Sequence, residues 1–96
     1  MFVEDYPDDS CAVFVFDAPE YLSFYGRNTI LDLDIIFVDS GIIDSVKSIR
    51  GMDCSPITSD GKCNMAIEVK AGWCSANNIQ AGMEVYMSLD TVTFLS

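Results

Sequence analysis

The segment between Leu33 and Ile49 restricts the possible folds most, because it predicts a β hairpin. Residues 33–38 (LDIIFV) combine β-branched and aromatic side chains, which favour strands. Residues 39–41 (DSG) are a turn sequence, and a second β run covers residues 42 to about 49. Two such runs joined by a tight turn pair as antiparallel neighbours. The centre of the chain therefore predicts an antiparallel sheet.

Short strands separated by turns are predicted along the rest of the chain. Residues 11–16 (CAVFVF) are apolar on both faces, which predicts a central strand covered on both sides and ended by residues 17–20. Further strands are predicted at residues 21–25, 65–69, 84–87 and 91–95. The last of these alternates polar and apolar residues, as an exposed edge strand does.

Two segments break the β pattern. Residues 73–78 predict a short helix that ends at Asn77 or Asn78 in a left-handed conformation. Residues 50–62 contain turn-forming Gly, Pro, Ser and Asp and predict a long irregular loop. We therefore predict a mainly β fold with one short helix, in a single domain that covers all 96 residues.

The chain is strongly acidic, with 15 Asp and Glu against 5 Lys and Arg and a formal net charge of −10. The first 40 residues hold a single base, Arg27, and most of the acids: Glu4, Asp5, Asp8, Asp9, Asp17, Glu20, Asp32, Asp34 and Asp39. Such a surface repels nucleic acid and anionic membranes, because both bind through cationic side chains. We therefore expect no direct nucleic acid or membrane partner. A basic protein, a cation or simple solubility fits this charge.

Cysteine usage indicates a reduced protein without a cofactor. The four cysteines form no CxxC pair, and the chain has no histidine to complete a zinc site. Cys54 and Cys63 could close a disulfide in an oxidising compartment. The start of the chain (MFVEDYPDDS) is acidic and lacks the apolar core of a signal peptide, and no apolar run is long enough to span a bilayer. We expect a soluble, cytoplasmic protein.

Two ordered blocks of the sequence resemble a known family. The first is SFYGRNT at 23–29 followed by LDIIFVD at 33–39, and the second is AIEVKAGW at 66–73 followed by NIQAGMEV at 78–85. Both are similar to the signatures of domain of unknown function 192 (DUF192), found in bacteria and some phages. The resemblance covers nearly the whole chain and implies an antiparallel β sandwich or barrel, similar to a jelly roll. It implies no activity, because the family has none assigned.

The chain departs from the family pattern in three places. Tyr25 and Gly26 stand where the family has Trp and Met, and Asp32 replaces a common proline. Family members also carry a further strand and a helical turn before the segment matched by residues 1–2. A sheet without an outer strand exposes unpaired backbone groups. We therefore expect a homodimer formed through an exposed sheet edge, or a strand donated by a partner.

The polar segments 23–29 and 33–35 predict a ligand site. Its ligand-binding candidates are Tyr25, Arg27, Asn28, Asp34, Glu68 and Trp73. Arg27 could clamp a ligand carboxylate or phosphate, or it could pair with Asp34 or Glu68. Tyr25 and Trp73 offer flat faces for a sugar ring or a peptide side chain, although a lone Trp in a small core also suits packing.

Asp32 and Asp34 provide the main alternative, a catalytic or metal site. Two residues apart in a strand, their side chains would leave the same face with Cβ atoms about 7 Å apart. With Glu68 they could hold a divalent cation or act on a glycosidic bond. We prefer a structural role, in which Asp34 accepts hydrogen bonds and Asp32 is solvated, because no histidine or third ligand is specified. No catalytic residue and no metal ligand is therefore assigned.

These observations give three candidate functions in order of preference. The first is a non-catalytic binding module for a small polar ligand or an extended peptide. The second is an interaction or inhibitor protein that acts through its acidic face or an open sheet edge. Mimicry of nucleic acid would need a continuous face made by Glu4, Asp5, Asp8, Asp9, Asp17 and Glu20. The third is a metal-assisted or carboxylate hydrolase.

Overall fold

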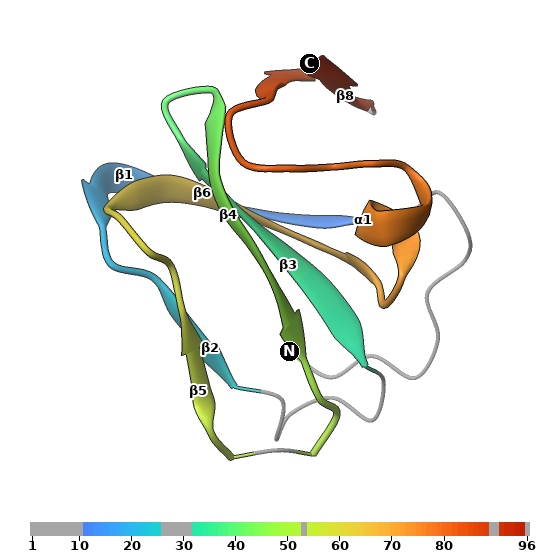
Figure 1. The fold of residues 1–96 in the computed structure, drawn as a ribbon. Helices are drawn as coiled ribbons and strands as arrows, with labels where there is room; N and C mark the ends of the chain where they lie inside the picture. The colour runs from blue at the N-terminus through green and yellow to red at the C-terminus, as the bar shows by residue number, and fades with distance from the viewer. Residues whose placement is uncertain (1–10, 26–31, 53, 89–90, 96) are drawn as a thin grey trace.

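The computed structural model of this chain describes residues 11–25, 32–52, 54–88 and 91–95. In these residues a six-stranded sheet has the order β1-β6-β3-β4-β7-β8 (Figure 1). Its strands pair antiparallel and comprise β1 (Ala12–Glu20), β3 (Leu33–Asp39), β4 (Ile42–Ile49), β6 (Cys63–Lys70), β7 (Glu84–Met87) and β8 (Val92–Leu95). A second sheet pairs β2 (Ser23–Tyr25) with β5 (Pro56–Thr58), and the helix α1 (Trp73–Ala76) follows β6.

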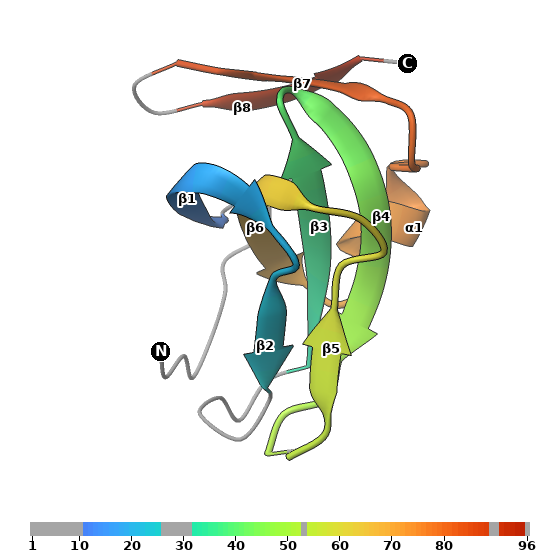
Figure 2. The ribbon, with the colours of Figure 1, turned by 90° about the vertical axis from the view of Figure 1, so that its left-hand side faces the viewer.

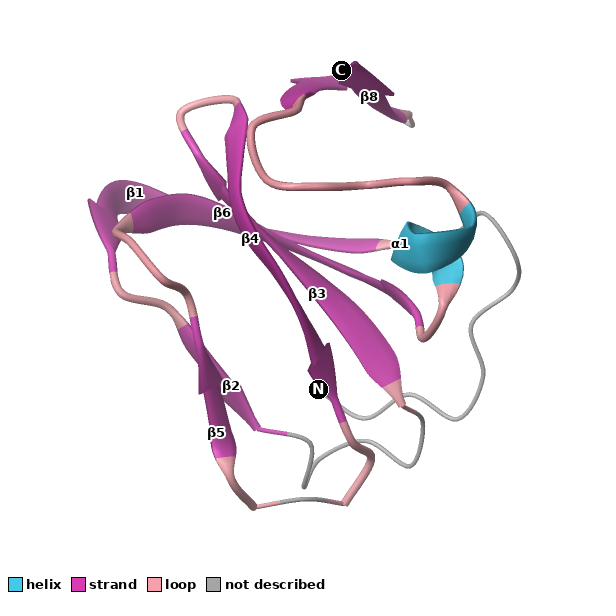
Figure 3. Ribbon diagram, in the orientation of Figure 1, coloured by secondary structure: helices cyan, strands magenta, loops and turns pink. Residues whose placement is uncertain are grey.

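The large sheet curls so that different elements cover its two faces (Figure 2). On one face Ile35 and Phe37 of β3 pack beneath β2 and β5, and the rings of Phe24 and Phe37 lie 6.0 Å apart. On the other face Ile36 and Val38 pack against α1 and the segment that leads into β7 and β8. This alternation makes β3 the buried centre of the molecule. The result is a curled antiparallel half-barrel with one short helix, which confirms the predicted fold class (Figure 3).

The predicted hairpin between Leu33 and Ile49 is confirmed as β3 and β4. Asp39 pairs with Ile42, so the loop between them contains only Ser40 and Gly41. Both loop residues have positive φ, 50° and 89°, as a two-residue turn that matches strand twist requires. The register shifts once, between Phe37 and Val38, which places an extra β4 residue, Asp44, in a bulge.

The prediction for residues 11–16 is wrong, because β1 is the outermost strand of the described sheet rather than a central one. The strand also continues through residues 17–20, with a register irregularity between Val15 and Glu20, so those residues do not end it. Both faces of β1 read as apolar because Phe14 packs into the core beneath β2 and β5 while Val13 packs into the core beneath α1. Val15 lies outside both cores and is 67% exposed.

Residues 50–62 are not the uniformly irregular loop that their composition predicts. They contain β5, whose residues Pro56 and Ile57 pair with Tyr25 and Phe24 of β2. Ile57 joins the same core as Phe24, which explains why this short segment is extended. The local turn residues hide a strand that depends on a distant partner.

The later elements agree with prediction. The helix α1 spans four residues, and Asn78 adopts the expected left-handed conformation with φ 56°. The strands predicted at 65–69, 84–87 and 91–95 correspond to β6, β7 and β8. β7 and β8 run across one end of β3 and β4 (Figure 2), and β8 is the outermost strand on that side of the described sheet.

Candidate functional site

Asp34, one of the predicted site residues, is a buried carboxylate with three hydrogen bonds to the protein. It lies in β3 and is only 5% exposed. Its Oδ1 accepts a hydrogen bond from the Ser48 hydroxyl at 3.2 Å. Its Oδ2 accepts from the backbone nitrogens of Gly72 at 3.1 Å and Cys74 at 3.2 Å. A carboxylate with three protein donors is engaged within the fold, and a ligand would have to compete with these donors for its oxygens.

These bonds explain how α1 begins. Gly72 occupies the N-cap position in a left-handed conformation and has no side chain to accept from the first turn. Asp34 replaces that missing cap from a neighbouring strand, and its negative charge suits the positive end of a helix. Ser48, which pairs with Asp34 in the β3–β4 ladder, completes the cluster. The sequence motif LDI therefore serves to hold α1 on the sheet.

Asp32 lies apart from this cluster, before β3 begins. It is exposed, and its Oδ1 accepts a hydrogen bond from the Gly51 backbone at 2.9 Å. Its backbone carbonyl accepts from Ala71 at 3.2 Å. The two carboxylates thus bind different loops.

Glu68 and Asp34 lie on opposite faces of the large sheet. Residues paired across a ladder share a face, and Glu68 pairs with Ile35 while Asp34 pairs with Val69. Ile35 belongs to the core beneath β2 and β5, whereas Val69 belongs to the core beneath α1. Glu68 is 7% exposed, buried on the side away from Asp34. The two carboxylates cannot act on one ligand atom.

The two aromatic candidates are also separated. Tyr25 is 50% exposed at the end of β2, and alternation with the inward Phe24 places it on the outer side of that strand. Trp73 begins α1 on the other side of the molecule, with its ring centroid 5.8 Å from that of Phe94. Arg27 and Asn28 lie outside the described residues, so their roles stay predictions. The four described candidates divide between the two sides of the large sheet and do not converge.

A second polar cluster ties the β4 bulge to the turn between β5 and β6. Asp44 Oδ2 accepts from the Gly61 backbone at 3.0 Å and from the Ser45 hydroxyl at 2.9 Å. The buried Ser59 hydroxyl donates to the Gly61 carbonyl at 2.7 Å and accepts from Leu22 at 3.1 Å. Burial alone would raise the pKa of Asp44, but hydrogen bonds, led by that from Gly61, outweigh it and lower the pKa. This cluster has the character of a structural tie.

The two buried cysteines are not activated thiols. All four are free, with Cys11 and Cys54 exposed and Cys63 and Cys74 buried, so Cys54 and Cys63 do not form a disulfide. Burial, reinforced by the Asp34 carboxylate, raises the pKa of Cys74 to about 12. Burial and the Asp44 charge raise the pKa of Cys63 to about 11. A nucleophilic cysteine needs the opposite shift.

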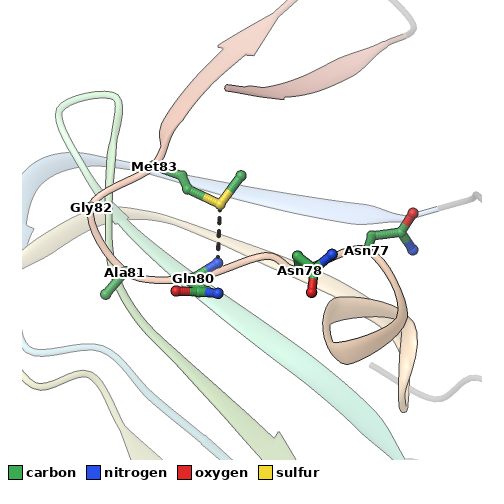
Figure 4. A pocket seen from close by; sticks show the side chains of 6 residues that line it. All are labelled: Asn77, Asn78, Gln80, Ala81, Gly82 and Met83. Carbon is green, nitrogen blue, oxygen red and sulfur yellow. Dashed lines mark hydrogen bonds between the residues drawn. The ribbon is translucent and has the colours of Figure 1, made fainter. Parts of the chain in front are cut away.

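An open cavity lies in the loop between α1 and β7, a place the sequence analysis did not single out (Figure 4). Its volume is about 530 Å³. We call it the amide cavity, since three of its six lining residues carry carboxamides: Asn77, Asn78, Gln80, Ala81, Gly82 and Met83. The sequence carries a signal for it, three amides within the four residues 77–80, although Asn77 and Asn78 are equally typical of a helix end.

The described residues hold no group of three His, Cys, Asp or Glu side chains placed to bind a metal ion. None of the helical segments in the described parts of the chain has the length and apolar character needed to cross a membrane.

The fold and its polar clusters define a class of protein: a small antiparallel half-barrel whose central strand carries a carboxylate that anchors a short helix. The family model of DUF192, described as "Uncharacterized ACR", matches residues 1–87, so the chain belongs to the DUF192 family. No curated protein matches the chain.

Two solved structures are similar to this one. A protein of unknown function from Novosphingobium aromaticivorans DSM 12444 has 25% sequence identity and a TM-score of 0.82, over 86% of this chain and 61% of its own. A protein from Sinorhizobium meliloti 1021, described as a proposed transcription regulator, has 21% identity and a TM-score of 0.78, over 94% of this chain and 66% of its own. The chain thus spans less than two thirds of the length of each. The likenesses show the fold and bring no activity with them.

Proposed function

We propose that this protein is a non-catalytic binding module whose ligand site is the amide cavity. The observation that carries the proposal is the lining itself, in which uncharged hydrogen-bonding groups from one loop border an open cavity of about 530 Å³. That volume falls within the range of small-molecule sites. Such a lining can recognise a ligand but supplies no acid, base or nucleophile of ordinary strength.

The carboxylates support a role other than catalysis. Asp34 is occupied by three protein donors, and Glu68 lies on the opposite face of the sheet. A hydrolase with two carboxylates needs both on one substrate, at most about 9.5 Å apart and facing the same bond. The paired-aspartate alternative fares no better, because Asp32 binds Gly51 at a separate loop.

A thermal-shift screen of the purified protein tests the proposal. The panel contains saccharides, amino acids, short peptides, nucleotides and divalent metal ions. A ligand at a hundredfold over its Kd should stabilise the protein by about 2.7 kcal/mol. The shift should be smaller in Asn78→Gly, which removes an amide but keeps the left-handed conformation, and should be unchanged in Tyr25→Ala. A shift lost in Tyr25→Ala and kept in Asn78→Gly would move the site to the segment 23–29.

A second candidate is association with another copy through β8. The strand carries no charged residue in a chain of net charge −10, so two copies that pair there place no like charges on the facing strands. Ser88 donates to Thr91 across the β7–β8 turn, and the ladder alternation then directs the backbone groups of Val92 and Phe94 away from β7. The neighbouring outer face presents the exposed side chains Tyr86 and Leu95.

A further inference from the structure

We infer that the ligand of the amide cavity is a neutral saccharide, an inference that rests on the binding function proposed above. Four features of the cavity lead to a neutral saccharide: the uncharged lining residues, their hydrogen-bonding groups, their apolar surface and the fixed position of the loop. The three carboxamides come from Asn77, Asn78 and Gln80, as Figure 4 shows.

None of the described residues that line the cavity has an ionisable side chain. A charged ligand would therefore lose hydration without gaining an opposite charge. An anion would also be repelled by the net charge of −10 on the chain. The cavity thus favours a neutral ligand.

The carboxamides call for a ligand that donates and accepts at adjacent positions. Each offers a carbonyl acceptor beside an amino group with two donors, and each sugar hydroxyl both donates and accepts. Among the described residues the side-chain amides of Asn78 and Gln80 have no protein partner. The carbonyl oxygen and the amino group of each are therefore available to a ligand. Asn77 donates through Nδ2 to the Trp73 carbonyl at 2.8 Å, so it keeps its own carbonyl and one N–H for a ligand. Neighbouring hydroxyls of one sugar ring match this set.

The remaining lining residues supply the apolar complement. Met83 and Ala81 present carbon and sulfur surface to the same cavity, which suits the C–H face of a sugar ring. The Gln80 backbone nitrogen lies 3.2 Å from Met83 Sδ and holds that side chain against the loop (Figure 4). None of the described lining residues is aromatic, so they offer no stacking surface of the kind that a nucleobase would use.

The loop is fixed before any ligand binds. Gly82 donates to the Ile43 carbonyl at 2.8 Å, and Ile43 donates back to the Met83 carbonyl at 2.9 Å. At the other end Ile79 donates to the Cys74 carbonyl at 2.9 Å and buries its side chain beneath α1. A site held in this way spends less free energy on ordering when it binds.

Titration calorimetry with glucose, N-acetylglucosamine, maltose and cellobiose tests the inference. We expect at least one of these saccharides to bind with a Kd on the order of 1 mM, because the cavity is open and lacks an aromatic platform. Asn78→Gly and Gln80→Ala should each raise the Kd for that saccharide about fivefold, which corresponds to the loss of roughly one net hydrogen bond. Asn64→Ala is the matched control: it removes an amide on β6 that accepts from the Ser40 backbone at 3.1 Å, and it should leave binding unchanged.

Charge variants at one position separate the ligand classes. Gln80→Glu and Gln80→Lys keep a long polar side chain but add opposite charges. A cation should bind more tightly to Gln80→Glu and more weakly to Gln80→Lys, and an anion should do the reverse. A neutral saccharide has no charge for one variant to attract and the other to repel, so it should show no such opposite changes. If no saccharide binds while an amino acid, peptide, nucleotide or metal ion does, the ligand is not a saccharide, but the proposal of a binding module still holds. If no probe of any class binds, both proposals fail.

Discussion

The Asp34 carboxylate of β3 lies 3.2 Å from the backbone nitrogen of Cys74 and fixes the start of α1 to the centre of the sheet. The same oxygen accepts from Gly72, whose lack of a side chain leaves the helix without a cap of its own. The loop that forms the amide cavity begins directly after this helix. Asp34 is therefore a positioning residue for the cavity in our account.

Asp34→Asn should destabilise the protein by about 2 kcal/mol or more. The amide cannot accept at all three contacts, and each hydrogen bond to a buried carboxylate contributes about 1.5–3 kcal/mol. Urea unfolding followed by circular dichroism measures the loss. Asp32→Asn is the control, because this exposed carboxylate accepts a single backbone bond from Gly51 and its replacement should cost less than about 1 kcal/mol. Equal losses in the two variants would contradict the structural role of Asp34.

The buried thiols predict a loss of stability in alkaline solution. The pKa of Cys74 rises from 9.0 to about 12 on folding, through burial and the Asp34 charge, so the folded state holds the thiol proton more tightly. Its contribution is fully present below pH 9 and is lost as the pH rises toward 12. We expect the melting temperature of the native protein, measured relative to that of Cys74→Ala, to decrease above pH 9. A difference that stays constant with pH would contradict this prediction.

Gly61→Ala should destabilise the turn between β5 and β6 through one contact. A Cβ at position 61 would lie 2.7 Å from Asp44 Oδ1, closer than real Cβ contacts. The Asp44 carboxylate must turn away from the new Cβ and weaken its hydrogen bonds to Gly61 and Ser45, which costs about 0.5–1.5 kcal/mol. The cost should shrink when Asp44 is also replaced by alanine, so a double-mutant cycle measured by urea unfolding should show coupling. Gly82→Ala is a useful comparison, because it adds strain at φ 92° but meets no atom within 4 Å. Additive losses for Gly61→Ala and Asp44→Ala would contradict the contact.

Association through β8 predicts a concentration-dependent mass in light scattering. Thr93→Lys places a charge on this uncharged strand and should shift the protein toward the monomer, because charges on an edge strand oppose pairing. Thr58→Lys, on β5 of the smaller sheet, is the control and should not alter the mass. A single monomeric mass for the native protein across micromolar concentrations would exclude this second candidate.

The sequence predicted most of the fold because its strongest signals were local. The β3–β4 hairpin depends on one turn and two adjacent β runs, and Asn78 ends its helix by its own conformational preference. β5 was missed because a three-residue strand among turn residues is stabilised by β2, more than thirty positions away. β1 was misplaced because an edge strand that contacts two cores has the same apolar pattern as a central one.

The candidate site was harder to predict for a physical reason. Successive side chains on a strand point to alternating faces of the sheet. The LDI motif alone does not show which face Asp34 occupies, or that α1 lies on that face and donates to the Asp34 oxygens. Glu68 is far from Asp34 in the sequence, and only the pairing of β3 with β6 shows that the two carboxylates lie on opposite faces of the sheet. The amide cavity depends on how one loop folds over the sheet, which residue types alone do not specify.

Nuclear magnetic resonance titration of the isotope-labelled protein locates a bound ligand residue by residue. Two-dimensional amide spectra are recorded while the panel of saccharides, amino acids, peptides, nucleotides and metal ions is added. Our account predicts that a saccharide moves the signals of residues 77–83 and leaves those of Tyr25 and Glu68 in place. Signals that move around Tyr25 and Glu68 instead, or that stay still with every probe, would contradict it.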